Sequence, residues 1–227
     1  MKKALGKFLL VLVLVAAALP SWGQKRIYTK GYKMQDFRSK TTKIVLDAGP
    51  MGRSIRQEVT SLWTISPYEF CTPEQYEKQK TSPDYYFLHT ETSRGIICLT
   101  LEKGGKPEDP NDLKKPFTVV SLPISGEQDQ SGRVYIYMPA YISVIQDYTD
   151  AAINSETVAY TGVKAICRGV PRGVRVVKDP AEADKAFSEH TPETAVRVTV
   201  TPTGDPSDKP RYHLTFGTED YRLYSFR

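Results

Sequence analysis

The chain contains, in order, KIVLD (43–47), MGRSIRQEVTSLW (51–63), YEFC (68–71), TPEQYEKQK (72–80), YYFLHTE (85–91) and GIICLTLEK (95–103). Short apolar runs alternate there with segments of helical period, which predicts the order β-α-β-α-β-β. Such an order is typical of an α/β (or α+β) fold, in which helices pack on a mixed β-sheet. The stretch carries no catalytic, cofactor or nucleic-acid motif, so it predicts a fold and not a function.

Two helices in this stretch have clear signals. The first has a single apolar stripe, which we interpret as core, formed by Met51, Ile55, Val59, Leu62 and Trp63. The second is expected at residues 73–80, because Thr72 is a good N-cap and Pro73 suits the first helical position. Ser93-Arg94-Gly95 predicts a hairpin turn between the last two strands.

The rest of the chain continues the alternation of strands and helices. We expect strands at residues 117–125, 134–140, 173–179, 194–204 and 212–226, the last as one or two antiparallel strands. We expect helices at 140–155 and 180–188, whereas 159–167 fits a helix or an extension. A loop at 104–115 and a turn at 205–209 complete the assignment. Residues 42–227 would thus form a single domain with a sheet of about six to eight strands.

Residues 1–23 have the organisation of a signal peptide. Three lysines open the segment, an unbroken apolar run covers Phe8–Leu19, and Ser21 and Gly23 place small residues where a signal peptidase cuts. The apolar run is shorter than the roughly 20 residues of a spanning helix, although a retained anchor is the alternative. We therefore expect an exported protein, periplasmic or associated with the cell envelope, after cleavage near Gly23.

Charge argues against a nucleic-acid partner. The leader holds three of the 31 basic residues and none of the 26 acidic ones, so the mature chain would carry a net charge of +2. Phosphate binding needs a concentrated positive field, which this balance does not indicate. Residues 24–41 are locally basic and contain three aromatic residues. They predict an edge strand or a mobile arm that touches anionic lipid headgroups or a partner, or else a solvated segment with its aromatics on the domain.

The three cysteines, Cys71, Cys98 and Cys167, leave at least one thiol unpaired in an oxidising compartment. No CxxC motif is present, so a thioredoxin-type site is not supported. Three interpretations stay open: buried small hydrophobic residues, one disulfide, or thiol chemistry at Cys98.

Acidic residues near strand ends, Asp47, Glu69 and Asp84, are the candidates for acid–base chemistry. A hydrolase-like enzyme that uses Asp47 and Glu69 is accordingly the alternative function. The three histidines lack zinc-ligand spacing, and we expect no metal and no cofactor. Gly49–Gly52 could hold an anion at a helix start, but we interpret these glycines as turn residues.

Residues 62–88 carry Trp63, Tyr68-Glu69-Phe70, Tyr76-Glu77-Lys78 and Tyr85–Leu88. This pattern resembles one that recurs in uncharacterised exported proteins of Bacteroidota-type bacteria. The predicted element order is also similar to the small α/β domain of TolB amino-terminal and curli-secretion-lipoprotein proteins. The resemblance implies a non-enzymatic binding or assembly protein with a protein partner in the cell envelope. We take Asp47, Trp63, Tyr68 and Glu69 as candidate binding residues.

Overall fold

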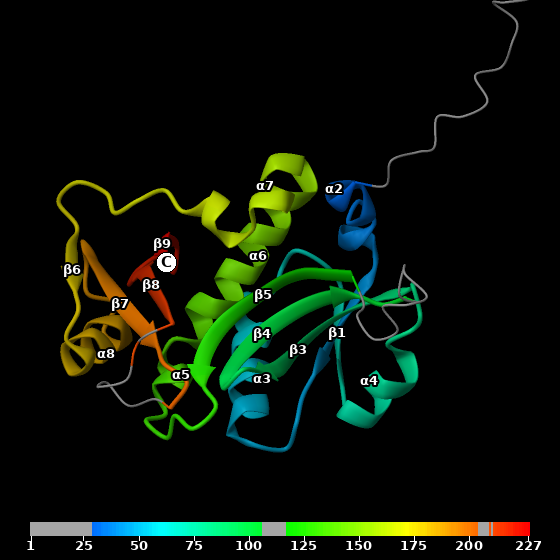
Figure 1. Cartoon of the computed structure of the whole chain (residues 1–227), viewed down its shortest axis with the longest axis horizontal. Coiled ribbons are helices and arrows are strands. Elements are labelled where there is room, and N and C mark those ends of the chain that lie inside the picture. Colours follow the sequence, from blue (N-terminus) through cyan, green and yellow to red (C-terminus); the bar gives the residue numbers. More distant parts are fainter. Residues whose placement is uncertain (1–28, 106–116, 204–208, 210) are drawn as a thin grey trace, which may run out of the picture.

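A computed structural model describes residues 29–105, 117–203, 209 and 211–227, and it has a mixed α/β fold (Figure 1). The expected signal peptide at 1–23 lies outside the described residues, as do most of the expected loop at 104–115 and turn at 205–209. In the described part of the chain, no helix has both the length and the apolar character needed to cross a membrane.

The first sheet contains β1 (Thr41–Val45), β2 (Tyr68–Cys71), β3 (Tyr85–Ser93), β4 (Ile96–Lys103) and β5 (Phe117–Gly126). Its strand order is β2-β1-β3-β4-β5, in which β1 runs parallel to β2 and β3 and the other pairs are antiparallel. The parallel strands are connected by α3 (Pro50–Leu62) and α4 (Pro73–Gln79). The predicted order β-α-β-α-β-β is therefore confirmed.

Local chemistry explains where these elements begin and turn. The Oγ1 of Thr72 accepts from the Gln75 amide at 3.3 Å, and the Gln75 side chain accepts from the Thr72 amide at 2.9 Å, which makes a capping box at the start of α4. Between β3 and β4, Arg94 and Gly95 have φ of 51° and 76°. Positive φ at both central positions gives the hairpin turn whose twist matches the flanking strands.

The second sheet contains β6 (Arg175–Val177), β7 (Thr194–Val200), β8 (Tyr212–Gly217) and β9 (Leu223–Phe226), in that spatial order. α8 (Pro180–Ser188) connects the parallel pair β6 and β7. The strands thus divide between two sheets rather than joining one. Where the two sheets meet, the end of β5 lies against the residues that follow β7, but the two strands do not pair. A Cβ added to Gly126 in β5 would lie 2.0 Å from the carbonyl oxygen of Thr201.

The predicted strand at 134–140 is wrong. These residues form α5 (Arg133–Ile136) and the first turn of α6 (Met138–Asn154), which was expected from residue 140. The alternation V-Y-I-Y suggested a strand, but Tyr137, Tyr141 and Tyr148 are all fully or almost fully buried, at helical spacing. Pro139 lies in the first turn of α6, where a missing amide hydrogen costs nothing.

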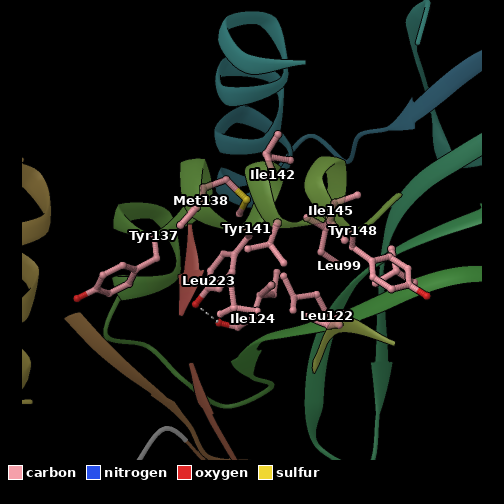
Figure 2. Packing of buried hydrophobic residues seen from close by; sticks show 14 of the residues in the cluster. Leu99, Leu122, Ile124, Tyr137, Met138, Tyr141, Ile142, Ile145, Tyr148 and Leu223 are labelled. Atoms are coloured by element: carbon pink, nitrogen blue, oxygen red, sulfur yellow. Dashed lines mark hydrogen bonds between the residues drawn. The ribbon is translucent and has the colours of Figure 1, made fainter. Parts of the chain in front are cut away.

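α6 lies between the two sheets and packs against both (Figure 1). Its inner side contacts Leu99 and Leu122 of the first sheet and Leu223 of the second (Figure 2). The Tyr141 hydroxyl donates to the carbonyl of Ile124 at 3.1 Å, and its ring meets Phe216 edge-on at 5.6 Å. One helix therefore closes a core to which both sheets contribute.

Residues 24–41 were expected as an edge strand, a mobile arm, or a solvated segment with its aromatics on the domain. Their described part before β1, residues 29–40, forms α2 (Lys30–Lys33) and a 3₁₀ helix (Phe37–Ser39). It is neither an edge strand nor a mobile arm, because Met34 and Phe37 are fully buried on the domain. α2 lies beside α7 (Glu156–Thr161), whose Glu156 carboxylate accepts from the amides of Gly31 and Tyr32 (Figure 1). The segment at 159–167, left open, holds the end of α7 and a second 3₁₀ helix, Val163–Ile166.

Candidate functional site

At the carboxyl ends of β1 and β2, the chain leaves the first sheet toward opposite faces. Phe70 of β2 lies on the face covered by α3, where the guanidinium of Arg56 stands 4.1 Å from its ring centroid. Tyr76 of α4 packs instead on the other face, 5.2 Å from both the Phe87 and His89 rings. Open α/β sheets bind ligands in the crevice outside such a pair of strand ends.

A cavity of about 600 Å³ lies at this crevice. It is lined by the loop after β1 (46–48), the first turns of α3, and residues 70–75 at the end of β2 and the start of α4. The volume falls within the ordinary range for small-ligand sites, about 300–1,000 Å³. Position and size thus agree on one candidate binding site, called here the strand-end cavity.

Asp47 lines the strand-end cavity and fixes the start of α3. Its Oδ1 accepts from the amides of Gly49 at 2.8 Å and Gly52 at 3.2 Å. A Cβ on Gly52 would lie 2.2 Å from the Asp47 carbonyl oxygen, so the loop needs glycine there. Because Asp47 satisfies the amides at the helix start, the arrangement supports the turn interpretation of Gly49–Gly52 over an anion site on those amides.

Two arginines on α3, Arg53 and Arg56, contribute guanidinium groups to the lining of the strand-end cavity. Arg53 Nη1 donates to the Ala48 carbonyl at 3.1 Å. The Arg56 guanidinium stacks on Phe70 and makes no hydrogen bond or ion pair with a described residue. A guanidinium held over an aromatic ring keeps its N–H groups available, which suits a carboxylate or a phosphate. The site can therefore bind an oxyanion.

The three cysteines lack the lowered pKa of an activated thiol. Burial raises the pKa of the Cys71, Cys98 and Cys167 thiols, so each is protonated near neutral pH. All three are unpaired. Cys71 contributes a small, neutral side chain to the wall of the strand-end cavity, and Cys98 lies outside it.

The four candidate binding residues are not brought together. Asp47 lines the strand-end cavity, whereas Trp63 is only 5% exposed and its indole N–H donates to Ser66 Oγ at 3.1 Å. Tyr68 lies on β2 with its ring edge-on to Phe70 at 5.5 Å. Glu69 pairs with Lys43 Nζ at 3.1 Å.

Sequence reasoning missed Arg53 and Arg56. Their signal was present, because both lie in the first two turns of a helix that follows a predicted strand end. The third strand-end acid, Asp84, accepts from the hydroxyl of Ser82 at 3.2 Å and does not line the strand-end cavity.

A buried polar cluster anchors α4 to the first sheet. The Tyr76 hydroxyl donates to Glu102 Oε1 at 2.6 Å, and His89 Nε2 lies 3.4 Å from Glu102 Oε2. Burial alone lowers the pKa of His89, but the adjacent Glu102 carboxylate outweighs it and leaves that pKa raised. Glu102 is only 4% exposed, so we interpret this cluster as an anchor rather than a ligand site.

Among the described residues, no group of three or more histidine, cysteine, aspartate or glutamate side chains is placed to hold a metal ion. No family model matches the chain, and neither a curated protein nor a solved structure matches it. Function therefore has to be inferred from the geometry and chemistry of the site itself.

Proposed function

We propose that this chain is an exported, non-enzymatic binding protein of the cell envelope, and that its strand-end cavity receives a carboxylate of a protein partner. One observation carries the proposal: Arg56 is stacked on Phe70 beside Arg53, in a cavity at the crevice of an α/β sheet. A guanidinium held in this way loses little freedom when it grips a carboxylate.

A peptide segment fits the surroundings of the strand-end cavity better than a free ion does. β2 is the outermost strand of the first sheet, and no described strand pairs with its outer edge. An extended segment can add to such an edge through backbone hydrogen bonds, while pockets beside it select side chains. An acidic residue of that segment would then enter the cavity and meet Arg56.

Binding is favoured over the alternative of a hydrolase that uses Asp47 and Glu69. The Asp47 carboxylate holds two backbone amides, and the Glu69 carboxylate pairs with Lys43. Asp47 lines the strand-end cavity, whereas Glu69 does not. A general acid and a general base have to flank one bond, which this separation does not support.

Export is supported by the lysines and the apolar run of residues 1–23. A mature chain that begins after Gly23 is the form to test. Amino-terminal sequencing of protein recovered from the cell envelope checks the cleavage position, and a retained leader would favour the membrane-anchored alternative.

The test uses the mature chain and fluorescein-labelled acidic peptides, with binding measured by fluorescence anisotropy. A hydrogen bond to a charged group contributes about 1.5–3 kcal/mol, so Arg56→Gln should weaken binding by about tenfold to a hundredfold. Arg56→Lys should also weaken it, because an ammonium keeps the charge but loses the planar donors stacked on Phe70. Arg172→Gln, at an exposed arginine outside the cavity, is the matched control.

Two results would overturn the proposal. Peptide affinity that is unchanged by Arg56→Gln would remove the strand-end cavity as the binding site. Turnover of ester or peptide substrates that is lost in Asp47→Asn, with an unchanged circular dichroism spectrum, would favour the hydrolase instead.

A further inference from the structure

A second cavity, larger than the first, lies on the outer side of α6 and is called here the α6 groove. Its volume is about 990 Å³, and its other wall consists of residues 165–171 and the β8–β9 turn with the start of β9. It shares no lining residue with the strand-end cavity. The volume is at the upper end of the range for small-ligand sites.

The α6 groove combines an apolar lining with a fixed wall. Its apolar side chains come from the connection after α3, from α6 and α7, and from the opposite wall: Ile65, Ala151, Val158, Ile166 and Leu223. Gln146 ties α6 to the residues after α3, since its Oε1 accepts from the Thr64 amide at 2.8 Å and its Nε2 donates to the Leu62 carbonyl at 2.9 Å. A wall held by two hydrogen bonds keeps the shape of the groove before a ligand arrives.

The α6 side of the groove is acidic. Asp150 is paired with Arg38, whereas Asp147 makes no hydrogen bond or ion pair with any residue that the structure describes. The Asp147 side chain is exposed along the groove, and desolvation by its surroundings raises its pKa. Asp150 and Asp220 add to this effect, while Arg222 and Arg168 oppose it. An unpaired carboxylate in such a place gains from a cationic partner.

The opposite side of the α6 groove presents two guanidinium groups. The Arg222 backbone amide donates to Asp220 Oδ1 at 3.1 Å, but its guanidinium is held only loosely, with Nε 3.7 Å from Asp220 Oδ2. The Arg168 guanidinium makes no hydrogen bond or ion pair with a described residue. Both lie near enough to Asp147 to influence its pKa, yet neither is within ion-pair distance of it. Opposite charges therefore face each other across a gap that a ligand can bridge.

We propose that the α6 groove binds a small zwitterion, an amino acid or a short peptide with an apolar side chain. The ligand ammonium would lie at Asp147, its carboxylate at Arg168 and Arg222, and its side chain on the apolar lining. Charge-assisted bonds at both ends fix the orientation of the ligand, and the apolar contact adds affinity. This site goes beyond the proposed function, because it uses a different cavity and a different class of ligand.

The test titrates leucyl-leucine into the mature chain and follows binding by isothermal titration calorimetry. The amino-acetylated and the carboxyl-amidated dipeptides each lack one charge, so each should bind about tenfold or more weakly than the zwitterion. Free leucine, titrated in parallel, reports whether one residue fills the groove. Equal affinity for the zwitterion and both blocked forms, or no binding of the dipeptide or leucine at millimolar concentration, would overturn the proposal.

Two variants locate the binding in the α6 groove. Asp147→Asn should weaken binding of the dipeptide and remove the difference in affinity between the dipeptide and its acetylated form. Arg222→Gln should likewise weaken binding and remove the difference between the dipeptide and its amidated form. Glu189→Gln is the matched control, because Glu189 is an exposed acid at the C-terminal end of α8 and does not line the groove. Dipeptide binding that survives both groove variants would refute the site. The acidic-peptide titration of the strand-end cavity is a separate measurement, so either proposal can fail while the other stands.

Discussion

Removal of the Tyr76 hydroxyl should loosen α4 from the first sheet. That hydroxyl donates at 2.6 Å to Glu102, a carboxylate that is only 4% exposed. Hydrogen bonds to charged groups contribute about 1.5–3 kcal/mol, and the lower end applies here because Tyr76 is half-buried. One kcal/mol shifts the Tm of a chain of this size by about 2–4 °C, so Tyr76→Phe should lower Tm by about 3–6 °C.

The assay is thermal unfolding of the mature chain, followed by circular dichroism. Tyr76→Phe keeps the ring that packs on Phe87, so the change in Tm reports the hydroxyl alone. Tyr135→Phe is the matched control, because Tyr135 is 40% exposed and its hydroxyl makes no hydrogen bond to a described residue. If Tyr76→Phe unfolds within about 1 °C of the wild type, the anchor makes no measurable contribution and the reasoning fails.

The same anchor gives the stability a pH dependence with a defined sign. The pKa of His89 is raised in the folded state, so protonated His89 stabilises the fold fully below about pH 6.5, its unfolded pKa, and the contribution is lost as pH rises through the folded value. Glu102→Gln removes the charge responsible. Urea unfolding should therefore show a larger cost of Glu102→Gln at about pH 5.5 than at about pH 9. An equal cost at both pH values would contradict this assignment.

Three further predictions concern the core and the thiols. Gly126→Ala should lower the free energy of unfolding by about 1–3 kcal/mol in urea, because its Cβ would clash with the Thr201 carbonyl where the two sheets meet. An unchanged free energy of unfolding would mean that the backbone moves to accommodate the methyl group. Ile55→Ala should cost about 2–5 kcal/mol in the same assay, since Ile55 is 2% exposed. Thiol titration of the unfolded chain should find all three cysteines free, and a single free thiol would reveal a disulfide.

Local signals predicted most of the fold. The N-cap Thr72 and the following Pro73 predicted the start of α4, and the alternation Val196, Val198, Val200 predicted the buried face of β7. These signals succeed because capping and period-two burial depend on neighbours within a few residues. The same rule failed at residues 134–140, where a run of aromatic and β-branched residues has strand propensity but enters a helix that is buried by both sheets.

The division into two sheets and the site depended on contacts between distant residues. Nothing in the sequence of β5 shows that its edge meets the chain after β7 through Gly126. Asp47 was found because it follows a strand, but the partnership of Arg56 with Phe70 arises only once α3 crosses back over β2. The α6 groove was not anticipated, because its charged lining comes from α6, from Arg168 and from a turn more than sixty residues after α6.

The position of α6 in the chain has a consequence for biosynthesis. All five strands of the first sheet precede residue 127, but the helix that covers their inner face begins at Met138. While the nascent chain emerges, Leu99, Leu122 and Ile124 lack their cover until α6 has left the ribosome (Figure 2). During that interval the exposed apolar face can bind a chaperone or aggregate with other chains. A chain truncated after residue 126 would lack α6, so its apolar face would stay exposed and prone to aggregation.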